Sequence, residues 1–165
     1  MLRRLIDRAR ATPSSAILAV EVALAGFVLA GVGLAFASPF STLPFADIGL
    51  RTAAAAITAL TITSLLAASY RFVRLVTGRG GIAIESFWRG LELIFALFVT
   101  GIVALGVRLG EAVRAAPTTS GDGGSVYVGL FLAFVLAGVG LAVLVCLRAM
   151  WRVVNAEIQS ALGAA

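Results

Sequence analysis

Residues Ser125–Leu147 read SVYVGLFLAFVLAGVGLAVLVCL, a run that contains no charged side chain. A helix needs roughly 20 mostly apolar residues to cross the hydrocarbon core of a bilayer, so this run alone is long enough to span one. Three further runs of similar length and character precede it, at Ala16–Ala37, Thr52–Ser69 and Gly90–Val107. The sequence therefore predicts an all-α membrane protein, a bundle of four transmembrane helices in one domain that comprises residues 1–165.

The composition agrees with a chain that lies in lipid. Of the 165 residues, 61% are hydrophobic and only 13% are charged, and the mean hydropathy is +1.06. Soluble domains are about 25% charged. Every basic residue is an arginine, which in a chain rich in alanine, glycine and leucine is typical of a GC-rich prokaryotic genome. We therefore expect the plasma membrane of a prokaryote as the location.

The arginines alternate in number between successive connections, and this predicts the threading. Ten lie before the first run, between the second and third runs or after the fourth, against three at the other two connections. The ten are Arg3, Arg4, Arg8, Arg10, Arg71, Arg74, Arg79, Arg89, Arg148 and Arg152, and the three are Arg51, Arg108 and Arg114. Because arginine-rich connections stay on the cytoplasmic side, we expect an up-down-up-down bundle with both termini in the cytoplasm. The net charge is +5, and the arginines that cause it flank the membrane spans. This position indicates lipid headgroups rather than nucleic acid as the partner of these charges.

The N-terminal region has two interpretations. Residues 2–12 are basic and partly apolar, which is typical of a short helix in the membrane interface that ends near Pro13. Alternatively, residues 1–37 are a secretory signal peptide, because Ala35-Phe36-Ala37 fits a small-x-small cleavage pattern. The apolar run is longer than the apolar core of a usual signal peptide and contains Glu21, so we expect it to stay as the first span.

The sequence contains almost none of the side-chain patterns that catalysis uses. It has no histidine, and Cys146 is its one cysteine, so a histidine-based triad, a histidine-ligated metal and a thiolate cluster are excluded. No Gly-x-x-x-x-Gly-Lys phosphate loop is present. We therefore expect no catalytic residue, no metal site, no cofactor and no enzymatic activity.

Glu21 and Glu92 are the two acidic residues inside the apolar runs, and they are the candidate functional residues. A carboxylate within a membrane span is costly and is by default a functional hypothesis. Glu92 lies three residues after Arg89, so these two side chains can pair on one helix face. For Glu21, the candidate ion-pair partners are three arginines of the second cytoplasmic region. They are Arg71, Arg74 and Arg89.

Small residues recur along the first run at a spacing that favours a helix-packing seam. The seam consists of Ala19, Ala23, Gly26, Ala30, Gly33 and Ala37. Helices in lipid associate where small residues allow close approach. Glu21 lies on the opposite side of this helix, so two arrangements are possible. Either the seam packs inside the bundle and Glu21 seeks a partner outside it, or Glu21 faces the bundle and the seam packs on another subunit. Both predict a homo-oligomer or partner membrane subunits.

The second run carries four hydroxyl side chains. They are Thr58, Thr61, Thr63 and Ser64. Such side chains either bond to carbonyls of the preceding turn or reach a neighbouring helix. The sequence as a whole predicts a small multi-spanning protein that is a transport-type or accessory subunit without catalysis. The alternative is a proton- or cation-coupled transporter or channel that uses Glu21 within an oligomer.

Overall fold

The computed structural model describes residues 13–37, 44–76, 84–115 and 123–162, and each of these ranges is one α-helix. The helices are α2 (Pro13–Ala37), α3 (Pro44–Val76), α4 (Ile84–Ala115) and α5 (Gly123–Leu162). Each contains one of the predicted apolar runs. The predicted interfacial helix at residues 2–12 lies outside the described residues. The side of the membrane on which each terminus lies stays a prediction.

All four helices are long and apolar enough to cross a membrane, which confirms the predicted all-helical fold with four helices of this kind. The apolar segments are Ala16–Phe36, Asp47–Val73, Phe87–Ala112 and Val126–Ala161. The helices extend past the predicted runs, and α5 with its 40 residues is about 60 Å long, twice the thickness of a hydrocarbon core.

Local chemistry explains where two of the helices begin. Pro13 and Pro44 are the first residues of α2 and α3, and proline is favoured there because its missing N–H has no partner in the first turn. The acidic Asp47 lies in the first turn of α3, where the helix dipole stabilises a negative charge. Its carboxylate also pairs with Arg51 one turn later, at 2.9 Å.

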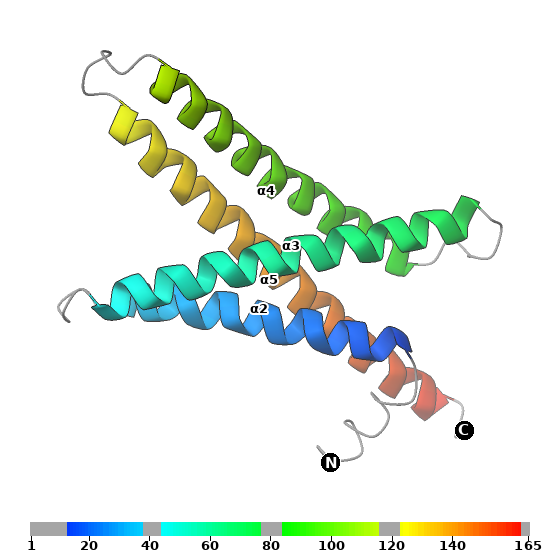
Figure 1. Ribbon diagram of the computed structural model, residues 1–165. Coiled ribbons are helices and arrows are strands. Elements are labelled where there is room, and N and C mark those ends of the chain that lie inside the picture. Colours follow the sequence, from blue (N-terminus) through cyan, green and yellow to red (C-terminus); the bar gives the residue numbers. More distant parts are fainter. Residues whose placement is uncertain (1–12, 38–43, 77–83, 116–122, 163–165) are drawn as a thin grey trace.

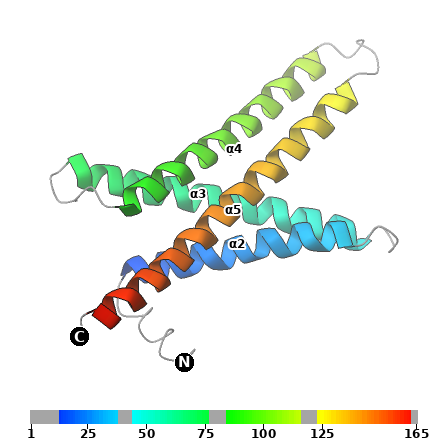
Figure 2. The same cartoon turned by 180° about the vertical axis from the view of Figure 1, so that it is seen from behind.

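The four helices form two antiparallel hairpins that cross each other (Figure 1). Helices α2 and α3 form one hairpin, and α4 and α5 form the other. Seen from behind, α5 lies across both helices of the first hairpin (Figure 2). Helix α4 packs against α3 and α5, but within the described ranges its backbone makes no close approach to α2.

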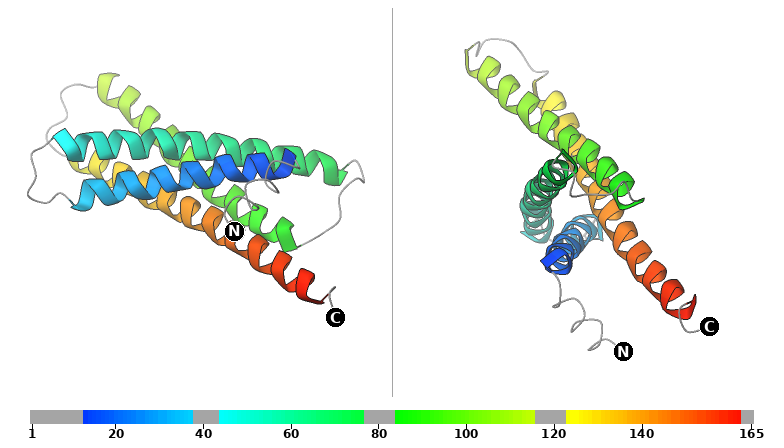
Figure 3. Two further views of the ribbon diagram at one scale, coloured as in Figure 1. Left: turned by 90° about the horizontal axis from the view of Figure 1, so that it is seen from below. Right: turned by 90° about the vertical axis from the view of Figure 1, so that its right-hand side faces the viewer.

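The start of α2, the end of α3, the start of α4 and the end of α5 lie at the same end of the molecule, as the two views in Figure 3 show. The opposite ends of the two hairpins diverge from one another (Figures 1 and 3).

Small residues allow the close packing in the first hairpin. A Cβ atom on Gly31 of α2 would lie 2.8 Å from the carbonyl oxygen of Gly49 of α3, and a Cβ on Gly49 would lie 2.8 Å from the carbonyl oxygen of Gly31. The two backbones therefore touch at this point, where only glycine fits on either side. Close backbone approach at small residues is the usual means of helix association in lipid.

The crossing of the two hairpins is packed in the same way. Gly138 of α5 leaves the space that the side chain of Ile57 from α3 fills at the crossing, and Gly140 of α5 leaves the space that Phe95 from α4 fills within the second hairpin. Around them lies a core of small and branched apolar side chains that are nearly inaccessible. They include Ala25, Val28, Leu60, Ala96, Val99, Leu141, Ala142 and Val145.

Large apolar side chains cover much of the outer surface. Phe27, Phe36, Phe98 and Leu136 are each more than half exposed. Exposed apolar area on this scale marks a surface that contacts lipid or another protein. The distribution therefore agrees with a protein embedded in a membrane.

The predicted packing seam lies on this outer surface. Five of its members are exposed: Ala19, Ala23, Gly26, Ala30 and Gly33. The structure does not describe the side chain of the sixth, Ala37. Nothing lies within 4 Å of a Cβ placed on Gly26 or Gly33. Of the two arrangements that the sequence left open, the structure therefore has Glu21 on the inner face of α2 and the seam on the outer face. Whether a second chain covers the seam remains a prediction.

Candidate functional site

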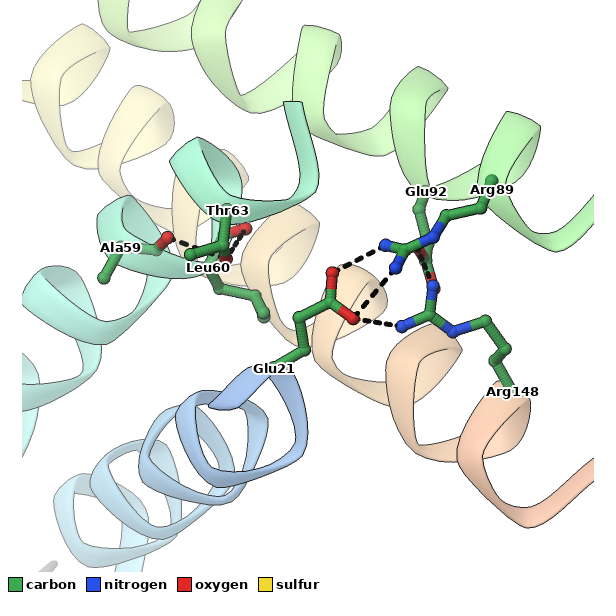
Figure 4. A network of polar contacts seen from close by, with 7 residues as sticks. All are labelled: Glu21, Ala59, Leu60, Thr63, Arg89, Glu92 and Arg148. Atoms are coloured by element: carbon green, nitrogen blue, oxygen red, sulfur yellow. Dashed lines mark hydrogen bonds and ion pairs between the residues drawn. The ribbon is translucent and has the colours of Figure 1, made fainter. Parts of the chain in front are cut away.

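Four charged side chains meet in the interior, and we call them the quartet: Glu21 of α2, Arg89 and Glu92 of α4, and Arg148 of α5 (Figure 4). The side chains of Glu21 and Arg148 are completely inaccessible, Glu92 is 1% exposed and Arg89 is 12% exposed. The quartet thus brings together both predicted acidic residues and one of the predicted arginine partners.

The charges alternate around the quartet, so that each guanidinium touches both carboxylates. Arg89 donates from Nη1 to Oε1 of Glu21 at 2.6 Å and from Nη2 to Oε2 of the same carboxylate at 3.2 Å. Its Nη1 also donates to Oε2 of Glu92 at 2.9 Å. Arg148 donates from Nη1 to Oε2 of Glu92 at 2.9 Å and from Nη2 to Oε2 of Glu21. The paired Nη contacts of Arg89 are the two-pronged geometry in which arginine binds carboxylates most strongly.

Helical spacing directs these side chains inward. Glu21 precedes the buried Ala25 and Val28 by four and seven residues, so it continues the inner face of α2. Arg148 follows Leu141 and Val145 by seven and three residues and continues the inner face of α5 in the same way.

On α4, Arg89 and Glu92 are three residues apart and lie on one face. The charges thus reach the interior along the same stripes that carry the apolar core.

The quartet is electrically neutral, since two arginines balance two glutamates. This matters because an isolated charge in a bilayer or a protein interior is costly, whereas paired and hydrogen-bonded charges are tolerated. It is also the direct link between α2 and α4, because the contact from Glu21 to Arg89 joins two helices whose backbones do not approach each other.

Three buried polar atoms have no hydrogen-bond partner within the described part of the chain: Oε1 of Glu92, Nε of Arg148 and Oγ of Ser64 on α3. Two of them belong to the quartet. The network is therefore neutral in charge but leaves one acceptor and one donor for further hydrogen bonds.

The other predicted partners of Glu21 have different outcomes. Arg71 is half-buried and makes interactions of its own, while the side chain of Arg74 lies outside those described. Arg148 was missed as a partner, because the sequence analysis assigned it to the cytoplasmic flank of the fourth run. The signal that identifies it is its helical register with Leu141 and Val145.

Most of the hydroxyl side chains of α3 form hydrogen bonds within their own helix. Thr58, Thr61 and Thr63 donate to the carbonyls of Ala54, Ile57 and Ala59 one turn earlier, at 2.8–3.0 Å. Figure 4 shows Thr63 bonded to its own helix and apart from the quartet. This confirms the first of the two roles for the three threonines, whereas Oγ of Ser64 has no partner among the described residues.

The described residues offer little else that resembles a site. None of their Cys, Asp and Glu side chains form a group of three or more that is arranged to hold a metal ion. A shallow hollow of about 240 Å³ lies between α2 and α3, and Ala16, Ile17, Val20 and Thr63 line it. Its walls are almost entirely apolar, and the one hydroxyl, that of Thr63, already donates to carbonyls of its own helix, so the hollow offers little that would orient a polar substrate.

Comparison with known proteins gives no assignment: no family model, no curated protein and no solved structure matches this chain.

Proposed function

We propose that this chain is a non-catalytic accessory subunit of a membrane assembly in a prokaryotic plasma membrane. The observation that carries the proposal is the quartet. The three buried ionisable side chains of the described helices, Glu21, Glu92 and Arg148, form a neutral network with Arg89 and connect helices, which is the arrangement of a structural element. A transport path or an active site would instead need such groups to face a substrate.

The proposal includes a membrane orientation. The arginine-rich connections and the quartet belong to the same end of the bundle, where α2 begins and α5 ends. The positive-inside rule favours this end in the cytoplasm, in an up-down-up-down arrangement with both termini inside.

Single-cysteine labelling tests this orientation. In a Cys146→Ala background, an impermeant thiol reagent applied to intact cells is expected to label Ser120→Cys and not Thr77→Cys, because the connection between α4 and α5 would face outward and the connection between α3 and α4 would face the cytoplasm. After the cells are opened, both positions should react. The reverse pattern in intact cells would refute the proposed orientation.

The outer face of α2 is the proposed contact with a second membrane helix, from another copy of this chain or from a partner subunit. In support, the five seam residues whose side chains are described are exposed, and α2 uses its other side for α3, α5 and the quartet. Small residues on an exposed helix face allow another helix to approach closely.

A large side chain placed on the seam should weaken assembly of the complex without weakening the folding of the chain. We expect Gly26→Leu to reduce the size of the complex purified in mild detergent but to leave the thermal stability of the dissociated chain unchanged, because nothing lies near a Cβ at this position. Leu29→Phe adds bulk to an exposed position off the seam and serves as the control. An unchanged complex size for Gly26→Leu, measured by light scattering, would remove the seam as an interface.

Proton- or cation-coupled transport is the second candidate, and one observation favours it. The free Oε1 of Glu92 and Oγ of Ser64 are buried acceptors that a proton or a small cation can use. If Glu21 carries the transported proton, Glu21→Gln protein in proteoliposomes should keep its fold and lose a pH-dependent flux.

A further inference from the structure

The last turns of α5 extend past the quartet and past the start of α2 (Figure 3). The apolar segment of this helix, Val126–Ala161, has 36 residues and is therefore about 54 Å long. A hydrocarbon core is about 30 Å thick, so a helix that crosses it at a usual tilt leaves the hydrocarbon well before this segment ends. Every side chain from Val153 to Ala161 is exposed, so none of the other described helices covers this part of α5.

The side chains of these turns are sorted by type around the helix. At about 100° per residue, Met150, Trp151, Val154, Ile158 and Ala161 lie within an arc of about 100°, which we call the apolar arc. The polar side chains of the same turns all lie outside it. They are Arg152, Asn155, Glu157, Gln159 and Ser160. An arc of this width is the pattern of an amphipathic helix.

The apolar arc continues a surface of α5 that already faces outward at the level of the quartet. Leu147, directly before Arg148, lies in the same arc and is 44% exposed, and Met150 is 64% exposed. Trp151 follows, and tryptophan concentrates where a spanning helix reaches the lipid headgroups. Because the apolar surface runs without a break from the span to the end of the helix, its continuous occupant is the bilayer.

The interface of the bilayer suits both sides of this segment. In water, Val154 and Ile158 would leave half of their apolar surface exposed, which is unfavourable. In the hydrocarbon core, Glu157 would carry its charge into lipid, which is costly. A helix that lies in the interface plane buries its apolar side at the boundary of the acyl chains and keeps its polar side in water.

We propose that residues 152–162 of α5 lie in the lipid–water interface at the quartet end of the bundle, with the apolar arc toward the acyl chains. This segment then attaches the quartet end to the membrane surface, whether the chain is an accessory subunit or a transporter.

Spin labels on the full chain in vesicles of phosphatidylcholine and phosphatidylglycerol test this placement. In a Cys146→Ala background, the single variants Val154→Cys and Ile158→Cys label the apolar arc, and Ala156→Cys and Ser160→Cys label the opposite side two residues later. Molecular oxygen concentrates in lipid, and a nickel chelate stays in water. We expect the ratio of oxygen to nickel accessibility to be several-fold higher at positions 154 and 158 than at 156 and 160.

Three other results would each overturn the proposal. High nickel accessibility at all four positions would show a helix that projects into water. High oxygen accessibility at all four would show a helix that stays in the hydrocarbon core. Low accessibility to both reagents at positions 154 and 158 would show that a second copy or another protein covers the apolar arc.

A matched pair of charges gives an independent check, read at the label on Val154→Cys. Ile158→Asp places a charge in the apolar arc, so it should raise the nickel accessibility of the label several-fold as the segment leaves the lipid. Ser160→Asp places the same charge on the water side and should leave the label unchanged. Equal effects of the two substitutions would contradict an orientation of the apolar arc toward lipid.

Discussion

Glu21→Gln is expected to lower the free energy of unfolding by about 3–5 kcal/mol, the usual cost of removing one partner from a buried ion pair. Glutamine keeps the size of the side chain but has no charge, so Arg89 and Arg148 would have to share the single carboxylate of Glu92. Thermal unfolding in detergent measures the loss. Glu157→Gln, at an exposed position near the end of α5, is the control and should change stability little.

A double variant distinguishes a lost ion pair from a general defect. Glu21→Gln/Arg148→Gln restores neutrality, so it should be less destabilised than the sum of its two single variants. Strict additivity would contradict an energetic coupling between Glu21 and Arg148. Unchanged stability of Glu21→Gln together with a lost proton flux would refute the structural role and favour transport.

Gly31→Ala should lower the free energy of unfolding by about 1–3 kcal/mol, the usual cost of forcing extra volume into a packed contact. The new Cβ would lie 2.8 Å from the carbonyl oxygen of Gly49 and 2.9 Å from the backbone nitrogen of Ala53, so the backbones of α2 and α3 must separate. Unlike a flexible side chain, a backbone atom cannot turn away.

Gly33→Ala is the matched control, because it lies two residues later in the same helix with nothing within 4 Å of its Cβ. Alanine is the better helix former by up to about 1 kcal/mol, so this variant should be neutral or slightly stabilised. Equal melting temperatures for the two variants would contradict the close contact between Gly31 and Gly49.

The four helices were predictable because each one must supply a long apolar run to the bilayer, and such runs are visible in composition alone. The pairing of Arg89 with Glu92 followed from their spacing, and Arg89 was among the three arginines considered for Glu21. Arg148 was missed for a physical reason. An arginine directly after an apolar run is normally solvated by headgroups, and only the tertiary crossing of α5 over α2 places it in the interior.

The seam shows a second limit of the sequence. Small-residue spacing identifies a face that permits close packing, but it does not say which side of α2 faces the bundle. Glu21 decides this, because a carboxylate turned to lipid costs more than the packing that small residues provide. Gly31, which makes the closest contact of α2, lies outside the seam and is recognised only once the register with Gly49 is known.

The division of the quartet between the two hairpins has a consequence for biosynthesis. The first hairpin supplies only Glu21, and the second supplies Arg89, Glu92 and Arg148. Because the ribosome delivers the N-terminal half first, the first hairpin enters the membrane with an uncompensated carboxylate, and the second follows with one surplus positive charge. Neither half is neutral until they join. A chain interrupted after α3 therefore keeps a glutamate among apolar helices without its quartet partners. Membrane-protein quality control can use this exposed charge to distinguish a truncated chain from a complete one.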